Sequence, residues 1–266
     1  PSGASTGSSE ALEKRDNDNY FMGKDVKKGL EIIEKKLSPL LIGQSCKDQK
    51  KFDEILLNFD SSIQKVNIGS NVSTALSIAN FLCANKLHNN NILEFETSNK
   101  NFKLPKPEIQ IFGGGTHSGN NRSFQDFLIY PLEELDLNSF FNNVHGIFYQ
   151  AKKIIESNNN FYGYCDEGGL YPNNLDHYQI CDIINESITK NNLTPGREIG
   201  ISIDVAATNF CKNGKYFLYD KVLDTGDLNI IYDNLISNYN VSLIEDPYNE
   251  KDFKSHANLK SVSKSA

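Results

Sequence analysis

The chain has 266 residues, of which 38% are hydrophobic and 11% aromatic, and its formal net charge is −7. This composition is too apolar for a disordered chain, and the length allows one or two domains with a sizeable core. The acidic balance argues against a nucleic-acid partner, and no apolar run is long enough to span a membrane. The cysteines form no CxxC pair and no secretory signal is recognisable, so we expect no disulfide framework, no zinc site and a reducing, cytoplasmic location.

The first hundred residues are expected to be helical. Three stretches carry apolar residues at helical spacing, namely residues 24–38, 47–59 and 71–87. We expect Pro39 to end the first of these helices. Residues 97–107 end in two prolines and predict a boundary. We therefore divide the chain into an N-terminal domain over residues 1–100 and a second domain over residues 105–266.

Beyond the boundary, strands and helices are predicted to alternate. The predicted strands are residues 108–112, 127–130, 199–205 and 241–244. The predicted helices are residues 137–157, 175–191 and 226–239. Alternation of this kind favours an α/β architecture in which helices connect the strands by right-handed crossovers.

Acidic residues fall near the ends of the predicted strands. Asp204 and Glu245 each follow an apolar strand, and Glu167 lies in a loop that contains two glycines. His117 and Asp126 flank the first two strands. Because ligands of α/β folds bind at the carboxyl ends of the strands, we expect these carboxylates to converge. Converging carboxylates form an oxygen-rich site, which suits Mg²⁺.

Each of these features also has a purely structural interpretation. Asp204 could cap a helix, and the segments Asp166–Gly169 and Glu245–Pro247 could be plain turns. His117 could simply be solvated. The glycines Gly113–Gly115 could cradle a phosphate or form a bulge, since their spacing matches no known nucleotide motif. The residues alone leave these alternatives open.

Six segments, taken in chain order, carry a resemblance to a known family. They are PSGASTG at 1–7, GGTHSG at 114–119, QDF at 125–127, DEGGLYPN at 166–173, IGISIDVAATNF at 199–210 and SLIEDPY at 242–248. Together they resemble the enolases (phosphopyruvate hydratases) over nearly the whole chain. The resemblance implies an α/β, enolase-type two-domain fold. The first domain would be the helical part of an α+β domain without its sheet strands, and the second roughly half of a TIM-like (β/α)8 barrel.

The resemblance also implies an activity. It is the glycolytic, Mg²⁺-dependent dehydration of 2-phosphoglycerate to phosphoenolpyruvate, carried out by a cytoplasmic homodimer with two Mg²⁺ ions in each active site. Asp204 and Glu245 would bind the first Mg²⁺, and Ser5 would bind the second when its loop closes. Glu167 would deliver the proton that lets the 3-hydroxyl group leave.

Three further residues are implied by the resemblance. Asp126 would be catalytic and, like Glu167, would also bind the substrate. His117 would contact the substrate near its phosphate, and Gln125 would support Asp126. The first departure from the family is at Asp126 itself, where enolases have the longer Glu. A displaced carboxylate is expected to slow the reaction.

Two more departures are Gly113 and Cys165, where enolases usually have Asn and Gly. In addition, both ends of the sequence look cut, and the family's base lysine and third carboxylate ligand would lie beyond it. We therefore expect the 266-residue chain alone to be inactive. A degenerate, non-catalytic protein that acts as a binding or structural partner remains an alternative. So does another superfamily member with a different acid substrate, although the retained loops argue against it.

Overall fold

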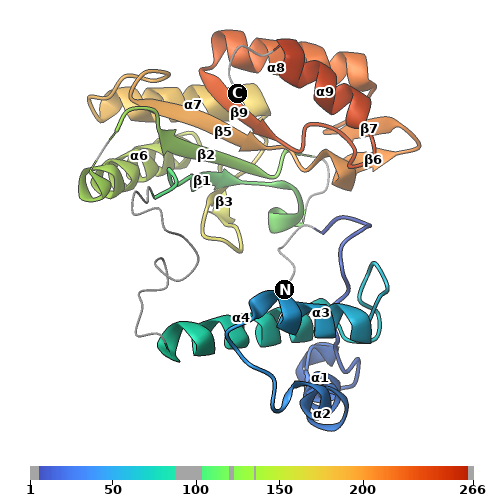
Figure 1. Ribbon diagram of the computed structural model, residues 1–266. Coiled ribbons are helices and arrows are strands. Elements are labelled where there is room, and N and C mark those ends of the chain that lie inside the picture. The colour runs from blue at the N-terminus through green and yellow to red at the C-terminus, as the bar shows by residue number, and fades with distance from the viewer. Residues whose placement is uncertain (1–5, 88–103, 120–122, 135, 263–266) are drawn as a thin grey trace. The chain divides into compact units, whose positions relative to one another are not determined.

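In the computed structural model, the residues that are described are 6–87, 104–119, 123–134 and 136–262. The chain divides into two compact units, Pro1–Leu104 and Pro105–Ala266, and each is described by itself (Figure 1). Most of the predicted boundary segment, residues 97–107, lies outside the described residues. No helix in the described part of the chain has the length and apolar character needed to cross a membrane.

All regular secondary structure in the described part of the first unit is helical. Its elements are η1 (Tyr20–Gly23), α1 (Lys27–Ile32), η2 (Ile33–Leu37), α2 (Ser38–Leu41), α3 (Gln49–Phe59) and α4 (Ser70–Leu87). They share a small apolar core formed by Leu37, Phe52, Leu56, Ile68 and Val72. The helical spacing of these residues in the sequence therefore reflects their burial, as expected for amphipathic helices.

Pro39 does not end the first helix, so this prediction was wrong. Helix α1 continues through the π-helical turn η2 into α2, which contains Pro39 near its start. The first N–H groups of a helical segment have no acceptor within the helix, and a proline is tolerated there. The backbone leaves the helical conformation only at Ile42, whose ψ is 130°.

The turn that follows α3 is organised by the carboxylate of Asp60, which is 1% exposed. It accepts hydrogen bonds from the backbone N–H groups of Asn67 (2.7 Å) and Ile68 (2.9 Å) and from the Ser62 hydroxyl (2.5 Å). Burial alone would raise the pKa of Asp60, but these hydrogen bonds outweigh it, and the pKa lies well below its usual value. The ionised carboxylate therefore holds the entry to α4 in place.

The second unit contains an open, six-stranded sheet that is not a closed barrel. Its strands are β1 (Ile109–Gly113), β2 (Asp126–Pro131), β3 (Phe161–Tyr164), β4 (Leu170–Pro172), β5 (Ile199–Asp204) and β9 (Val241–Glu245). Their spatial order is β3-β4-β1-β2-β5-β9. Strands β1 and β4 are parallel, as are β5 and β9, whereas β2 is antiparallel to both of its neighbours.

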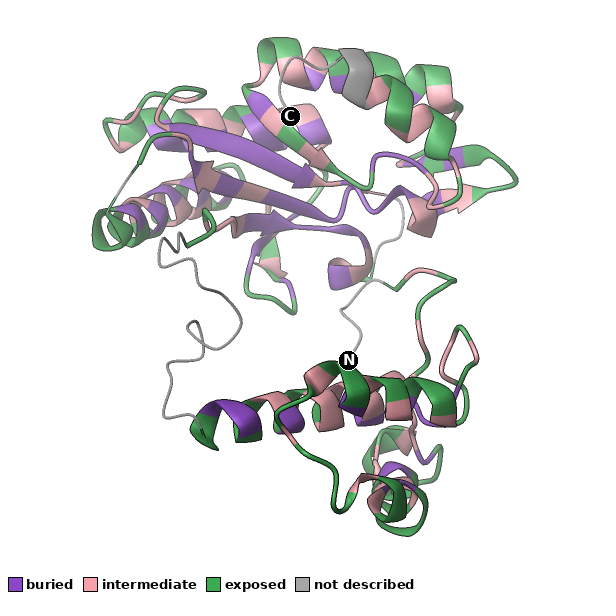
Figure 2. Ribbon diagram, viewed as in Figure 1, coloured by how far each residue is buried: buried purple, intermediate pink, exposed green. Residues whose placement is uncertain are grey.

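The helices of this unit are α6 (Leu137–Ser157), α7 (His177–Lys190), α8 (Thr225–Asn238) and α9 (Phe253–Val262), with short 3-10 turns η3 (Gly115–Ser118) and η4 (Ala207–Phe210). Helices α6 and α7 lie along one face of the sheet (Figure 1). Helix α7 begins after Asp176, as predicted, because Asp176 and Gln179 form a capping box. The central strands β2 and β5 are buried over most of their length (Figure 2).

Two features of the sheet differ from the simple alternation of strands and helices. The hairpin β3–β4 was not predicted, and neither was the small sheet formed by β6 (Cys211–Lys212), β7 (Lys215–Leu218) and β8 (Lys221–Leu223). In addition, β2 runs opposite to its neighbours. Its first residue, Asp126, therefore lies at the edge of the sheet where β1 and β5 end.

Candidate active site

Three acidic residues lie side by side at this edge of the sheet. Backbone pairing places Asp126 of β2 opposite Asp204 of β5, and Asp204 opposite Glu245 of β9. Residues that pair directly across neighbouring strands point to the same face of a sheet. The structure thus brings these three predicted acids together, with Asp126 entering from the start of its strand.

Asp204 is the central acid of the row and is fixed by two hydrogen bonds. Its Oδ1 accepts from the backbone N–H of Ala206 (2.9 Å), and its Oδ2 accepts from the side-chain amide of Gln125 (2.8 Å). Burial, followed by the charges of Glu245 and Asp126, raises the pKa of Asp204 to about 7. Asp204 thus forms a local turn with Ala206 and does not cap the following helical turn, whose N-cap is Ala206, and it also belongs to a cluster of negative charge.

Glu245 ends strand β9 and is exposed. Its pKa is raised by burial of part of the side chain and by the nearby charges of Asp246, Glu108 and Asp126. The turn after β9 is anchored from α8, where the Tyr232 hydroxyl donates to the Pro247 carbonyl (2.5 Å). A buried tyrosine therefore fixes the segment that presents the third acid.

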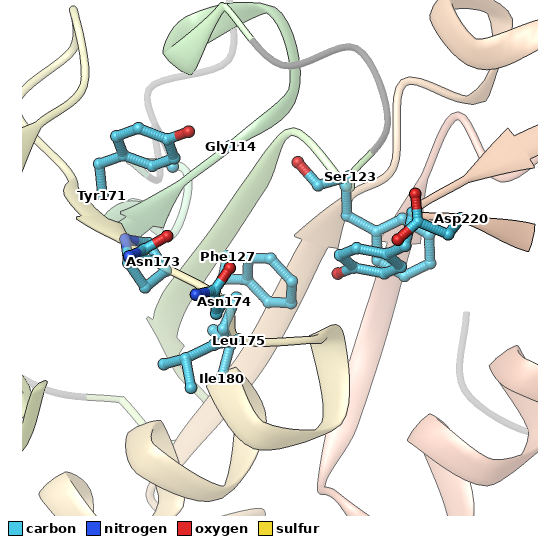
Figure 3. A pocket seen from close by; sticks show the side chains of 13 residues that line it. Gly114, Ser123, Phe127, Tyr171, Asn173, Asn174, Leu175, Ile180 and Asp220 are labelled. Atoms are coloured by element: carbon cyan, nitrogen blue, oxygen red, sulfur yellow. The ribbon is translucent and has the colours of Figure 1, made fainter. Parts of the chain in front are cut away.

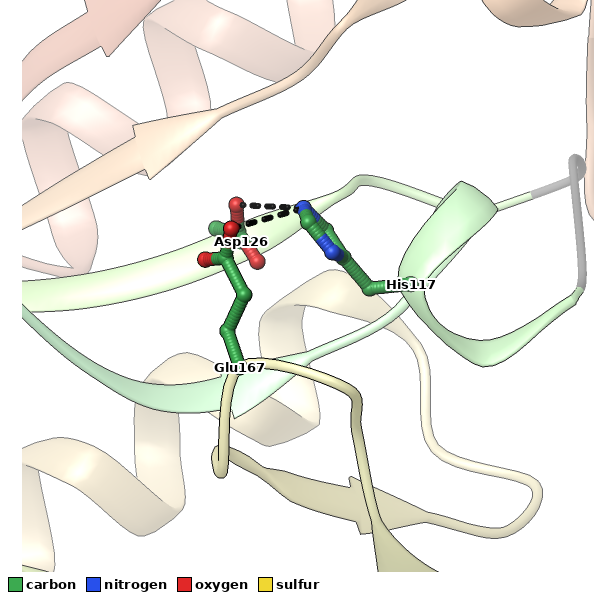
Figure 4. Close-up of side chains that lie close together, drawn as sticks. All are labelled: His117, Asp126 and Glu167. Carbon is green, nitrogen blue, oxygen red and sulfur yellow. Dashed lines mark ion pairs between the residues drawn. The ribbon is translucent and has the colours of Figure 1, made fainter. Parts of the chain in front are cut away.

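A second group, formed by His117, Asp126 and Glu167, lies at the same edge (Figure 4). The imidazole of His117 is almost completely buried, with Nδ1 2.6 Å from Asp166 Oδ1 and Nε2 3.4 Å from Asp126 Oδ2. Glu167 Oε1 lies 4.0 Å from His117 Nε2, and more than half of its side chain is exposed. Two loops and one strand thus place one imidazole among three carboxylates.

The charges of this group are coupled. Burial would lower the pKa of His117, but the charge of Asp126 and the hydrogen bond with Asp166 outweigh it, and the pKa is raised. Burial also raises the pKa of Asp126, although the hydrogen bond from Gln110 and the charge of His117 oppose this shift. Both groups therefore hold a proton more tightly than the free side chains do, and perturbed pKa values of this kind are common at functional sites.

Two glutamines support the acids, and only one of them was predicted. Gln125 was expected to support Asp126, but its side-chain amide donates a hydrogen bond to Asp204, and its side-chain oxygen accepts one from the Thr116 hydroxyl (2.8 Å). Asp126 instead accepts a hydrogen bond from the side chain of Gln110 on β1. The side-chain oxygen of Gln110 also accepts one from the N–H of Gly169 (2.8 Å). The signal that could have revealed Gln110 is a polar residue between the two isoleucines of a strand, Ile109 and Ile111.

Gly113 and Cys165, the two departures from the family pattern in this region, fit together sterically. A Cβ added to Gly113 would lie 2.6 Å from Sγ of Cys165, which is closer than real Cβ atoms approach. Cys165 is 7% exposed, so its thiol fills the space that a side chain at position 113 would need. Burial, followed by the charges of Asp126 and Asp166, raises the pKa of the Cys165 thiol to about 11, and it stays protonated.

The glycine run is not a phosphate cradle. The N–H of Gly114 donates to the Gln125 carbonyl (2.6 Å), and the N–H of Gly115 donates to the Ser123 hydroxyl (2.9 Å). These donors hold the start of β2 against the end of β1 and are not directed at a ligand. The glycines therefore have a structural role, although the irregularity in the β1–β2 register lies between Gln110 and Phe112 and not at the glycines.

A separate pocket of about 250 Å³ lies beside the glycine run (Figure 3). Its walls combine Ser123, Asn173 and Asn174 with the aromatic ring of Phe127. Phe127 follows Asp126 in β2, and successive strand residues point to opposite faces. The pocket therefore belongs to the helix-covered side of the sheet and is distinct from the acid row.

The chemistry of the acid row suits a hard cation. Among the described residues, one set of three potential metal ligands has its ligand atoms within 4.8 Å of one another, namely His117, Asp126 and Glu167. Mg²⁺ prefers oxygen ligands, so Asp204 and Glu245 match it better than a set that contains the imidazole. Ser5, the third predicted ligand, lies outside the described residues.

Comparison with known families matches almost the whole chain. Residues 1–95 match the model of the enolase N-terminal domain, and residues 101–265 match the model of the enolase C-terminal TIM barrel domain. The two-domain α/β fold class expected from the sequence is thus confirmed.

Curated relatives carry the same name. The enolase of Pelagibacter ubique is 33% identical over 261 residues, which are 97% of this chain and 62% of the relative. The enolase of Ehrlichia canis is 34% identical over 253 residues, which are 95% of this chain and 60% of the relative. The enolase of Pyrococcus furiosus is 33% identical over 258 residues, again 60% of its length. The chain therefore spans about three fifths of the length of these relatives.

Proposed function

Because the chain belongs to the enolase family, we propose that the whole protein is a lyase that dehydrates 2-phosphoglycerate to phosphoenolpyruvate. The observation that supports this proposal most directly is the row of Asp126, Asp204 and Glu245, paired in register at one edge of the sheet. His117 and Glu167 lie at the same edge. Removing a proton next to a carboxylate and expelling a hydroxyl group requires such a combination of cation-binding and proton-carrying groups.

The acid row fits the Mg²⁺ ions that the family implies. Asp204 is held beside Glu245 and Asp126, and the raised pKa of Asp204, about 7, reflects first the free-energy cost of burying its carboxylate and second the cost of gathering these charges. A divalent cation bound by Asp204 and Glu245 would offset this cost, and we propose Ser5 as a ligand of a second ion. When bound, Mg²⁺ would supply positive charge opposite the negative charge that develops on the carboxylate of the substrate.

The remaining residues would bind the substrate and carry protons. Glu167 would hold the proton that leaves with the 3-hydroxyl group as water, and its exposed side chain can reach a bound substrate. His117 would bind near the substrate phosphate, and Asp126 would both contact the substrate and keep the imidazole charged. Gln125 would orient Asp204. For removal of the α-proton the resemblance implies a lysine, which is not among the residues assigned here.

The organisation of the protein follows the same proposal. The first unit would be the enolase N-terminal-like domain, over residues 1–100, and the second an incomplete barrel-like domain, over residues 105–266. The protein would be cytoplasmic and homodimeric, as the resemblance implies. The division of the chain near Leu104 supports the proposed domain boundary.

The proposal is tested on the native protein, captured from its source cells with an antibody to residues 137–191. Formation of phosphoenolpyruvate from 2-phosphoglycerate is measured with added Mg²⁺ and, in parallel, with excess chelator. We expect turnover that the chelator abolishes. A captured protein that binds both Mg²⁺ and 2-phosphoglycerate but forms no product would contradict the proposal and identify a non-catalytic relative.

A further inference from the structure

Two of the five cysteines, Cys46 and Cys83, are neighbours in the first unit although they are distant in the sequence. Cys46 lies in the loop between α2 and α3, and Cys83 lies on α4. The thiol of Cys46 is a neighbour of the Cys83 thiol and raises its pKa. Cys83 is exposed and Cys46 is partly exposed, so a small oxidant in solution can reach the pair.

A network of buried amides holds the loop of Cys46 against α4. The side-chain amide of Asn80 donates to the Cys46 carbonyl (3.2 Å) and to the Gln49 side chain (2.9 Å). Gln49 in turn donates to the Ser77 hydroxyl (3.1 Å) on α4. Asn80 is 7% exposed, and Cys83 follows it by three residues, so both side chains lie on the same side of the helix. These contacts do not involve the thiols, and they hold the backbone of Cys46 against the helix that carries Cys83.

We propose that Cys46 and Cys83 form a reversible disulfide that ties the α2–α3 loop to α4. The pair is a modification site and does not depend on the proposed lyase activity. The other three cysteines belong to the second unit, where Cys165 and Cys181 are buried and Cys211 is partly buried. Because Cys165 and Cys181 are buried, an oxidant in solution has less access to them than to the exposed Cys83.

The chemistry is balanced with hydrogen peroxide as the oxidant. One thiolate attacks a peroxide oxygen, the O–O bond breaks, and the departing hydroxide takes up a proton to form water, which leaves a sulfenic acid on that cysteine. The sulfur of the second cysteine then attacks the sulfenic sulfur, the S–S bond forms, and a second water departs. Two thiols and one peroxide thus give one disulfide and two waters. An added dithiol reverses the reaction by thiol–disulfide exchange.

The test uses the full chain in dilute solution, first reduced and then treated with hydrogen peroxide. Free thiols are alkylated, and the digested protein is examined by mass spectrometry. We expect the loss of two of the five thiols, a peptide link between Cys46 and Cys83, and an intact mass lower by about 2 Da. Dithiothreitol should restore all five thiols. Oxidation of Cys83 alone to a sulfinic acid, or links that form only between chains, would overturn the proposal.

Three variants show whether the position of the pair matters. Cys83→Ser should abolish the intramolecular link, whereas the matched control Cys211→Ser should form it at the rate of the unmodified chain. Asn80→Ala removes the amide that holds the Cys46 carbonyl, and we expect the disulfide to form about five- to tenfold more slowly. An unchanged rate in Asn80→Ala, measured on protein with unchanged helical circular dichroism, would refute the role of the network. The mapping of the unmodified chain decides the main proposal even where a variant fails to fold.

Discussion

The carboxylate of Asp204 is expected to destabilise the metal-free protein. It lies beside Glu245 and Asp126, and its pKa in the folded state is about 7, whereas an unfolded chain gives an Asp pKa of about 3.9. The change Asp204→Asn keeps the size of the side chain and removes its charge. We therefore expect the metal-free variant to be more stable than the unmodified protein at neutral and alkaline pH.

The sign and size of this difference in stability follow from proton linkage. Between about pH 4 and about pH 7 the folded state holds a proton on Asp204 that the unfolded state has lost, so stability falls as the pH rises through this range. The difference between the two pKa values corresponds to about 4 kcal/mol when both states are ionised, at about pH 8. In the variant, the Asn side chain keeps the hydrogen bond from Ala206 but loses the charge-assisted hydrogen bond from the Gln125 amide. This loss offsets about 1–2 kcal/mol of the gain in stability. The expected net gain is about 2–3 kcal/mol.

Urea unfolding followed by circular dichroism, in excess chelator and over a range of pH, measures this gain. Hydrogen exchange of peptides that cover β5 assigns it to the second unit. Asp182→Asn is the matched control, because Asp182 is an exposed carboxyl on α7 outside the acid row. Added Mg²⁺ should stabilise the unmodified protein and leave Asp204→Asn unaffected, since the variant lacks a proposed ligand.

Two results would refute the reasoning. The first is an unmodified protein whose metal-free stability does not change between about pH 4 and about pH 8, since the buried charge would then have no cost. The second is a metal-free Asp204→Asn variant that is less stable than the unmodified protein at alkaline pH. Either result would mean that the hydrogen bonds to Asp204 outweigh the free-energy cost of keeping its carboxylate ionised beside Glu245 and Asp126.

Three further changes have defined outcomes. Asp60→Ala should lower the free energy of unfolding of the first unit by about 2–3 kcal/mol at neutral pH. Because the pKa of Asp60 is lowered, this stabilisation is present above about pH 4 and is lost as the pH falls. Equal urea midpoints for Asp60→Ala and the unmodified protein at neutral pH would contradict the prediction. Gln110→Ala removes the hydrogen-bond partner of Asp126 Oδ1 and of the Gly169 N–H and should cost about 1–3 kcal/mol, measured by the same method with the exposed Asp182→Asn as reference. Under the proposed function, Glu167→Gln in the whole protein should slow phosphoenolpyruvate formation about 10²- to 10⁴-fold and leave the Mg²⁺ affinity, measured by calorimetry, unchanged; weaker Mg²⁺ binding would instead make Glu167 a ligand.

Local signals predicted much of the second unit. Helix α7 was placed correctly because Asp176 caps its first turn, and the apolar spacing of residues 137–157 matches the bounds of α6. Asp204 and Glu245 were found because an acid directly after an apolar run is visible in the sequence itself. These features depend on neighbours within a few residues, which is the range that pattern and propensity describe.

The remaining features depend on contacts that are distant in the sequence. Pro39 was taken as a helix end because nothing local shows that a π-helical turn precedes it. Gln110 was missed because Asp126 becomes its neighbour only when β2 runs antiparallel to β1, and Gly169 only when β4 pairs with β1. The direction of β2 is set by the pairing of whole strands, and no residue within it signals that direction.

The fit between Gly113 and Cys165 makes the two positions interdependent. The resemblance to enolases implies Asn and Gly at these positions, so the side-chain bulk here stands on the loop and not at the end of β1. A Cβ added at 113 would lie 2.6 Å from the Cys165 sulfur, so a side chain at 113 and the thiol in its present place exclude each other. The thiol therefore restricts position 113 to glycine unless the loop or the sulfur shifts.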